Sequence, residues 1–131
     1  MILDYELKFW DNQPLTASGA SKVIDLLKGG DAKGRELFLR VIVGDTVAAA
    51  GAATVALQLR TSDSLDDSGA LKNPKILATT VAISKDDLVG GSEAWCIRMP
   101  YGALRYLDVN AVIATGPLTA GSFSAFLSSE L

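Results

Sequence analysis

Apolar and polar residues alternate with a period of two along most of the chain, a pattern typical of half-buried β-strands. Residues 54–60 (TVALQLR) show it most clearly, because their valine and two leucines fall on one face. Residues 36–43 (ELFLRVIV) alternate too, but both of their faces are largely apolar, so we expect a central strand. Further strands are predicted over residues 22–27, 76–83, 94–99, 105–115 and 121–127.

Glycine, proline and short polar residues separate these segments, as expected of turns between strands. The longest break is the polar loop 62–74, and one helical turn is expected at residues 86–88. Seven to eight short strands without crossover helices predict an all-β protein, an antiparallel β-sandwich or barrel. At this length we expect a single domain, residues 1–131, that begins with an N-terminal arm, residues 1–19.

The last two predicted strands are joined by residues 116–120 (GPLTA), which have the composition of a turn. Consecutive strands usually lie side by side, so we expect these two to pair as a hairpin that closes the sandwich. Pro117 and Leu118 would then lie at the tip of the hairpin, where they could contact a neighbouring subunit.

The composition is that of a soluble globular protein, with 49% hydrophobic and 21% charged residues and a net charge of −3. The negative charge argues against nucleic acid as a partner. The longest apolar run, residues 47–57, is about half the length of a membrane-spanning helix, so no membrane association is expected. The N-terminus has acidic residues where a secretory signal has basic ones, which indicates a cytoplasm-like compartment.

The chain contains no histidine, the side chain best suited to proton transfer at neutral pH. This excludes Ser-His-Asp and Cys-His nucleophile systems and any metal site that uses histidine. We therefore expect no enzymatic activity and no cofactor. The single cysteine, Cys96, lies in a predicted strand with no histidine to activate it, so a buried, inert thiol is expected.

Two loops share residue types with known binding loops but not their spacing. Residues 63–69 gather carboxylates, yet Leu65 and Ser68 stand where a calcium loop of the EF-hand kind has an oxygen ligand and a glycine. Residues 29–35 hold glycines and basic residues, but they lead into a strand instead of the Gly-Lys-Ser/Thr and helix of a phosphate loop. Both segments are interpreted as connecting loops.

Three large side chains are candidates for contacts with other subunits. Phe9 and Trp10 lie in the predicted arm, where aromatic side chains can anchor a subunit contact or pack back onto their own domain. Both readings stay open. Arg105 opens a predicted strand and could serve a partner, but a structural ion pair with a carboxylate such as Asp108 is favoured. Trp95 is expected to lie in the core.

The succession of local patterns resembles the jelly-roll cement, or decoration, proteins of tailed-phage capsids, especially those of short-tailed phages. The matching stretches cover nearly the whole chain in order: MILD (1–4), QPLT (13–16), SKVIDL (21–26), VALQLRTSD (55–63), PKILA (74–78), PYG (100–102), RYL (105–107) and TAGSFSA (119–125). Their order and spacing carry the resemblance.

The resemblance implies a jelly-roll β-sandwich that binds the outside of the assembled capsid and bridges neighbouring major capsid proteins. It implies self-association, with a dimer favoured, and neither catalysis nor a cofactor. The protein would be made in the cytoplasm of the bacterial host and end on the exterior of the virion. Pro14 and Tyr101 lie in matching stretches and complete the candidate partner-binding set, which is Phe9, Trp10, Pro14, Tyr101, Arg105, Pro117 and Leu118.

Two other functions remain as alternatives. A carbohydrate- or receptor-binding β-sandwich could use Trp10 or Tyr101 beside Asp11 or Asn12, because sugar sites combine aromatic rings with carboxylates and amides. A hydrolase ranks third, and only a carboxylate pair such as Asp66 and Asp67 could serve one without histidine.

Overall fold

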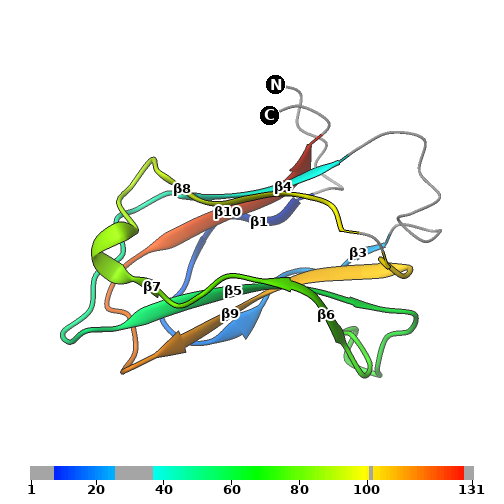
Figure 1. The fold of residues 1–131 in the computed structure, drawn as a ribbon. Helices are drawn as coiled ribbons and strands as arrows, with labels where there is room; N and C mark the ends of the chain where they lie inside the picture. The colour runs from blue at the N-terminus through cyan, green and yellow to red at the C-terminus, as the bar shows by residue number, and fades with distance from the viewer. Residues whose placement is uncertain (1–7, 26–36, 101, 129–131) are drawn as a thin grey trace.

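The computed structural model describes residues 8–25, 37–100 and 102–128, and it folds these into two antiparallel β-sheets that face each other (Figure 1). The four-stranded sheet has the order β1 (Lys8–Pro14), β10 (Ser122–Ser128), β4 (Phe38–Val43) and β8 (Glu93–Arg98). The six-stranded sheet has the order β2 (Gly19–Ala20), β9 (Tyr106–Ala114), β5 (Thr54–Ser62) and β6 (Lys75–Thr79). Two short strands complete it, β3 (Ile24–Asp25) beside β9 and β7 (Ile83–Ser84) beside β5.

The fold class is therefore confirmed as an all-β, antiparallel β-sandwich. The chain changes sheet repeatedly: β1, β4, β8 and β10 belong to one sheet, and the strands between them belong to the other. One 3-10 turn, η3 (Lys85–Asp87), connects β7 to β8, close to the helical turn predicted at residues 86–88. No helix among the described residues is long and apolar enough to cross a membrane.

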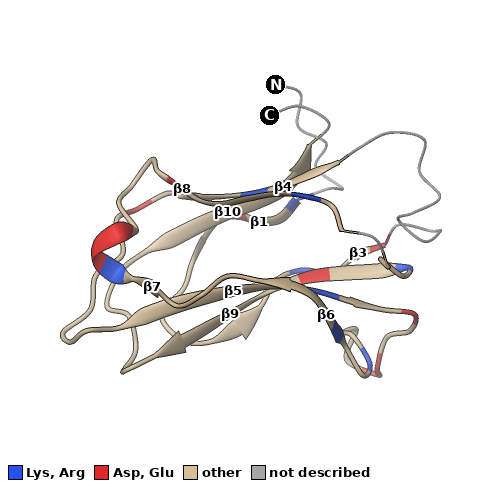
Figure 2. Ribbon diagram, viewed as in Figure 1, with Lys and Arg blue, Asp and Glu red and all other residues tan. Residues whose placement is uncertain are grey.

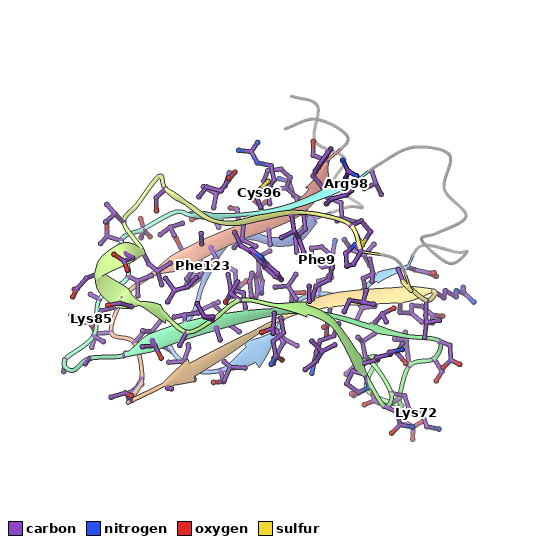
Figure 3. The ribbon with its side chains drawn as sticks, viewed as in Figure 1. Phe9, Lys72, Lys85, Cys96, Arg98 and Phe123 are labelled. Atoms are coloured by element: carbon purple, nitrogen blue, oxygen red, sulfur yellow. The ribbon has the colours of Figure 1, made fainter. Side chains whose placement is uncertain are left out.

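The core lies between the sheets and consists of the inward-facing residues of the alternating strands (Figure 3). Over residues 54–60 of β5 the predicted inward residues are fully buried and the others half-buried, so the sequence pattern is confirmed there. β4 is a central strand, as predicted, because it pairs with β10 on one side and β8 on the other. Burying one such aliphatic side chain contributes about 1.5–3 kcal/mol before conformational entropy is counted.

The predicted hairpin of the last two strands is wrong. β9 pairs with β5, β2 and β3, whereas β10 pairs with β4 and β1, so the two strands lie in different sheets. Their inward residues are the predicted ones, with Leu107, Val109 and Ala111 from β9 and Phe123, Ala125 and Leu127 from β10. The alternation therefore identified the inner faces, but it could not identify the sheet to which each strand belongs.

The predicted arm also needs correction, because residues 8–14 form β1 and pair with β10. Two register shifts interrupt this pairing, between Lys8 and Trp10 and between Trp10 and Gln13. Such β-bulges break the period of two, which is why this strand did not appear in the alternation. The predicted strand 76–83 is likewise divided into β6 and β7, and of the predicted strand 22–27 the structure describes only β3 and its approach. The loop 29–35 lies outside the described residues.

Candidate functional site

The structure divides the seven candidate contact residues among different places. Phe9, Trp10 and Leu118 are only 3–4% exposed and belong to the hydrophobic core. The ring of Trp10 lies 6.2 Å from that of Phe123, and Figure 3 shows Phe9 and Phe123 between the two sheets. Of the two readings left open by the sequence, packing onto their own domain is the one that these aromatic side chains adopt.

Arg105 has a structural partner, but not the predicted one. Its guanidinium donates to both carboxylate oxygens of Asp25, at 2.9 and 3.0 Å, and lies 4.9 Å from the centre of the Tyr106 ring. The hydrogen bonds that Arg105 donates to Asp25 raise the pKa of Arg105 above its ordinary value. Asp108 pairs with Arg60 instead. Tyr101 lies outside the described residues.

Pro14 and Pro117 remain exposed, and they lie at the same end of the sandwich. Pro14 is opposite Ser122 at the start of β10, and Pro117 lies in the connection from β9 to β10. The connection from β4 to β5 reaches the same end, because Ala48 and Ala120 form an antiparallel bridge. We call residues 48–53 and 115–121 together the alanine-glycine end.

The alanine-glycine end carries no charged side chain, and its residues are mostly small (AAAGAA and TGPLTAG). Most of them are exposed, while Ala53 and Leu118 are buried beneath them. The absence of charge extends along the chain, from Thr46 to Leu59 and from Val109 to Ser129. In Figure 2 both loops are tan at the left of the molecule, with the charged turn η3 on the same side. Asp45 also borders the second loop, because its carbonyl accepts from the Ser122 amide next to Gly121.

Backbone hydrogen bonds hold the two loops together. Ala48 donates to Ala120 at 3.0 Å and accepts from Thr119 at 2.8 Å, while the Leu118 amide donates to Thr16 at 2.9 Å. Gly121 has a φ of +141°, and a Cβ at this position would lie 3.0 Å from a methyl carbon of Val47. Glycine at residue 121 therefore permits the close approach of the two loops.

A buried hydroxyl fixes the neighbouring strand ends. Ser122 donates to the side-chain oxygen of Asn12 at 2.7 Å and accepts from the Asp45 amide at 2.8 Å. Ser122 itself is fully buried, and these bonds tie β1, β10 and the end of β4 to one another. The alanine-glycine end is thus a pre-shaped surface on a rigid frame.

A cavity of about 450 Å³ lies beside β1, between that strand and residues 19–22. It is lined by apolar and polar side chains, which include Phe9, Trp10, Gln13 and Lys22. Because Trp10 is 4% exposed, its ring does not offer the open face on which a sugar stacks. The geometry therefore weakens the carbohydrate-binding alternative at this position.

The acidic loop is held by its own hydrogen bonds. One carboxylate oxygen of Asp66 accepts from the amide and hydroxyl of Ser68, at 2.9 and 2.6 Å, and from the amide of Ala70 at 3.1 Å. These bonds lower the pKa of Asp66, the Ser68 hydroxyl most strongly. A hydrolytic carboxylate pair needs one acid whose pKa is raised, so the shift has the wrong sign for Asp66 to be that acid.

The sequence patterns did not identify residues 48–53, one of the two loops of the alanine-glycine end. Residues 48–53 were considered only as part of an apolar run too short to span a membrane, and their position beside Pro117 follows from the pairing of Ala48 with Ala120. One feature of the sequence points to these loops: neither residues 48–53 nor residues 115–121 include a charged residue.

The strands of the sandwich cover almost the same residues as the match to a known protein family. A family model described as Bbp16 matches residues 9–127, which run from the second residue of β1 to the penultimate residue of β10. No curated protein matches the chain. Because the match covers nearly the whole sequence, this chain belongs to the Bbp16 family.

Proposed function

We propose that this protein is a phage capsid cement protein, which binds the outer surface of the assembled shell and bridges neighbouring major capsid proteins. The observation that carries the proposal is the alanine-glycine end, an uncharged and exposed surface held by backbone hydrogen bonds. Small side chains let another backbone approach closely, and the absence of charge removes the cost of stripping water from ions.

The strand order supports the same proposal through the fold. If β2 is counted with β3, and β6 with β7, eight strands follow the orders 1-8-3-6 and 2-7-4-5 in the two sheets. We infer that the sandwich is of the jelly-roll type, an eight-stranded double sheet found in viral capsid proteins and in lectins. Fold alone does not assign function, so the contact surface carries more weight than the topology.

Such a protein would stabilise the shell through many weak contacts. A single small contact area provides little affinity, but a subunit that touches two capsid proteins at once gains from the high effective concentration of the second site. The protein would be made in the bacterial cytoplasm and act on the exterior of the virion, by binding alone and without a cofactor.

The test uses shells that lack the protein. Purified protein is added to expanded, undecorated shells of the parent phage, and the melting temperature of the shell is measured by scanning calorimetry with and without it. Since a ligand that binds only the assembled state stabilises that state, decorated shells should melt at a higher temperature. Identical melting curves for bare and decorated shells would reject the proposal.

A further inference from the structure

One side of the sandwich is left open between its two sheets. The edge strands at this side are β1 and β2, and the cavity of about 450 Å³ lies between β1 and residues 19–22. We call it the edge cavity. At the opposite side, large side chains of the edge strands pack against the core, namely Trp95, Ile97, Leu77 and Ile83. The edge cavity is therefore a local feature of the β1 side.

The filled side of the sandwich also corrects the prediction made for the single cysteine. Trp95 packs against the core from β8 and is half-buried. Cys96 points to the other side of the same sheet, away from the six-stranded sheet (Figure 3), and it too is half-buried. The expectation of a buried thiol is thus wrong, because Cys96 faces outward on an edge strand.

Small residues at the inward positions of β2 and its continuation create the edge cavity. Gly19 lies opposite Ala111, which is fully buried, and residues opposite each other share one face of a sheet. Gly19 therefore faces the four-stranded sheet, and a Cβ added to it would have no neighbour within 4 Å apart from the adjacent residues. The hydroxyl of Ser21 accepts from the Val109 amide at 2.9 Å and so stays close to β9. Neither residue fills the space that a large apolar side chain would fill.

The wall of the edge cavity on the other sheet is apolar. Phe9 and Trp10 line it from β1, and Leu15 lines it from the connection that follows. The two aromatic side chains belong to the core and close the cavity toward the interior. Displacing poorly ordered water from such a wall by an apolar group is favourable. The volume lies within the range of small-molecule sites, about 300–1,000 Å³.

Charged side chains line the more exposed part of the edge cavity. Asp11 and Lys22 are exposed and Lys8 is half-buried, so the lining holds two lysines and one aspartate. Lys8 lies 3.5 Å from Asp11, and Lys22 has an interaction of its own. An ammonium group has three N–H donors, however, and these contacts do not prevent it from serving a further acceptor.

The backbone of β2 adds a neutral donor to the lysines. The Ser21 amide donates to Val109 of β9 at 2.8 Å. Backbone groups of alternate residues point to opposite sides of a strand, so those of Ala20 point away from β9. Ala20 also lines the edge cavity, and its amide is therefore placed to donate to a ligand there.

We propose that the edge cavity binds a small molecule that joins one apolar ring or chain to a carboxylate. The apolar part lies against Phe9, Trp10 and Leu15, and the carboxylate accepts from the Ala20 amide near the two lysines. Because the lysines outnumber the aspartate, a carboxylate is favoured over an ammonium group. None of the lining residues belongs to the alanine-glycine end, so this inference goes beyond the capsid proposal and does not rest on it.

An NMR titration of the purified protein with 4-phenylbutyrate tests the class of ligand. The Trp10 indole and the Gly19 and Ala20 amides should shift in a saturable manner, with a Kd near or below ~1 mM for a probe of this size. The control ligand is 4-phenylbutan-1-ol, which has the same apolar part without the charge. It should bind at least ~5-fold more weakly, because it lacks the charge-assisted hydrogen bonds.

A pair of variants at residue 19 tests the location. The backbone of Gly19 is outside the left-handed region and its Cβ direction is open, so Gly19→Leu should fold and fill the cavity. It should bind 4-phenylbutyrate at least ~10-fold more weakly than the wild type. Gly19→Ala leaves most of the cavity open and should bind the probe normally, as the matched control.

A second pair of variants tests the charged lining without changing the walls. The double variant Lys8→Gln and Lys22→Gln should lose the preference for 4-phenylbutyrate over the alcohol and still bind the alcohol as the wild type does. Lys72→Gln with Lys75→Gln changes the net charge equally at exposed positions outside the cavity. This control should keep the preference for the carboxylate.

The proposal is overturned if 4-phenylbutyrate at about 10 mM, well above the expected Kd, produces no saturable shift of the cavity resonances. It is also overturned if folded Gly19→Leu binds the probe as tightly as the wild type does. Equal affinity of the wild type for 4-phenylbutyrate and 4-phenylbutan-1-ol rejects the carboxylate. If Gly19→Leu does not fold, the lysine variants decide, and an unchanged preference in Lys8→Gln with Lys22→Gln rejects the site.

Discussion

At the scale of single residues, two ion pairs have the same chemistry and different surroundings. Arg60 donates to both carboxylate oxygens of Asp108, at 2.9 and 2.7 Å, as Arg105 does to those of Asp25. The side chain of Asp108 is 1% exposed and that of Asp25 is 37% exposed. Asp108 lies on the outer face of β9, where its pairing with Arg60 accompanies its burial.

Asp108→Ala should lower the free energy of unfolding by about 1.5–3 kcal/mol, because it removes two charge-assisted bonds from a buried position. The figure lies below the usual cost of breaking a buried pair, since the Arg60 side chain is 20% exposed and can regain water. Asp25→Ala, the matched control in an exposed pair, should cost much less. Urea denaturation measures both. Equal losses in the two variants would contradict this account.

The Asp66 loop allows a prediction about pH. Since the Ser68 hydroxyl is the largest cause of the lowered pKa of Asp66, Ser68→Ala should raise that pKa toward its ordinary value. A lowered pKa in the folded state stabilises the fold above the ordinary pKa, and this contribution disappears as the pH falls through the lowered value. A carboxyl-detected NMR titration of wild type and Ser68→Ala measures the shift. An unchanged Asp66 titration would contradict the assignment.

At the scale of elements, side-chain hydroxyls take over where backbone pairing is interrupted. Ser18 and Ser21 accept from the Ile113 and Val109 amides of β9, at 2.8 and 2.9 Å, on either side of the two-residue β2. Thr80 does the same for the Leu57 amide of β5 at 3.0 Å, in the gap between β6 and β7. The edges of the six-stranded sheet are thus short strands completed by serine and threonine, around a long and regular centre.

This construction predicts a gradient of stability across the six-stranded sheet. β5 and β9 pair over nine residues each, and their inward side chains are fully buried except for the half-buried Ile113. Their amides should therefore exchange with solvent only on global unfolding. The amides of β2 and β3 should exchange sooner, through local opening. Native-state hydrogen exchange followed by NMR tests the order, and protection of Gly19 and Ala20 equal to that of β5 would refute it.

The sequence predicted those strands in which the alternation of apolar and polar residues is unbroken. β4 and β5 were recognised because unbroken alternation places every second residue in the core. β1 was missed because bulges place the adjacent residues Phe9 and Trp10 in the core together. The pairing of β9 and β10 was misjudged because each strand needs one apolar face whether the two strands form a hairpin or lie in opposite sheets. The seven residues between them are enough to cross the gap of about 10 Å between packed sheets.

The candidate site was predictable only in part, for a related reason. Pro117 was expected at an exposed tip and lies at one, but its neighbour Leu118 turns inward and is buried. Sequence pattern locates a connection between strands without showing which other connection lies beside it. The partner of the tip, residues 48–53, is brought there by the crossing of the chain between sheets.

At the scale of the whole molecule, the two ends of the sandwich differ in the charge of their loops. β5 and β9 run between these ends, with Thr54 opposite Ala114 at one end and Ser62 opposite Tyr106 at the other. The first end holds the two uncharged loops of the alanine-glycine end beside the charged turn η3, whose Lys85 amide donates to Ala53 at 3.2 Å. The second end carries the Asp66 loop and the pair of Arg105 with Asp25. Figure 2 shows the tan loops at the left beside the red and blue turn η3, and further charged segments at the right. One protein thus offers two chemically different surfaces to its surroundings.

This asymmetry yields a matched test of the surface proposed to meet the capsid. Ala50 and Ala70 are both exposed alanines in loops at opposite ends, so Ala50→Asp and Ala70→Asp introduce the same charge at different places. A carboxylate buried at an uncharged contact costs several kcal/mol, and Ala50→Asp should therefore bind undecorated shells at least ~10-fold more weakly than wild type. Ala70→Asp should bind normally, and both variants should keep the unfolding temperature of the wild type. Co-sedimentation with shells measures the binding. If Ala50→Asp binds normally and Ala70→Asp does not, the opposite end is the contact, because only a surface excluded from water in the complex is sensitive to the new charge.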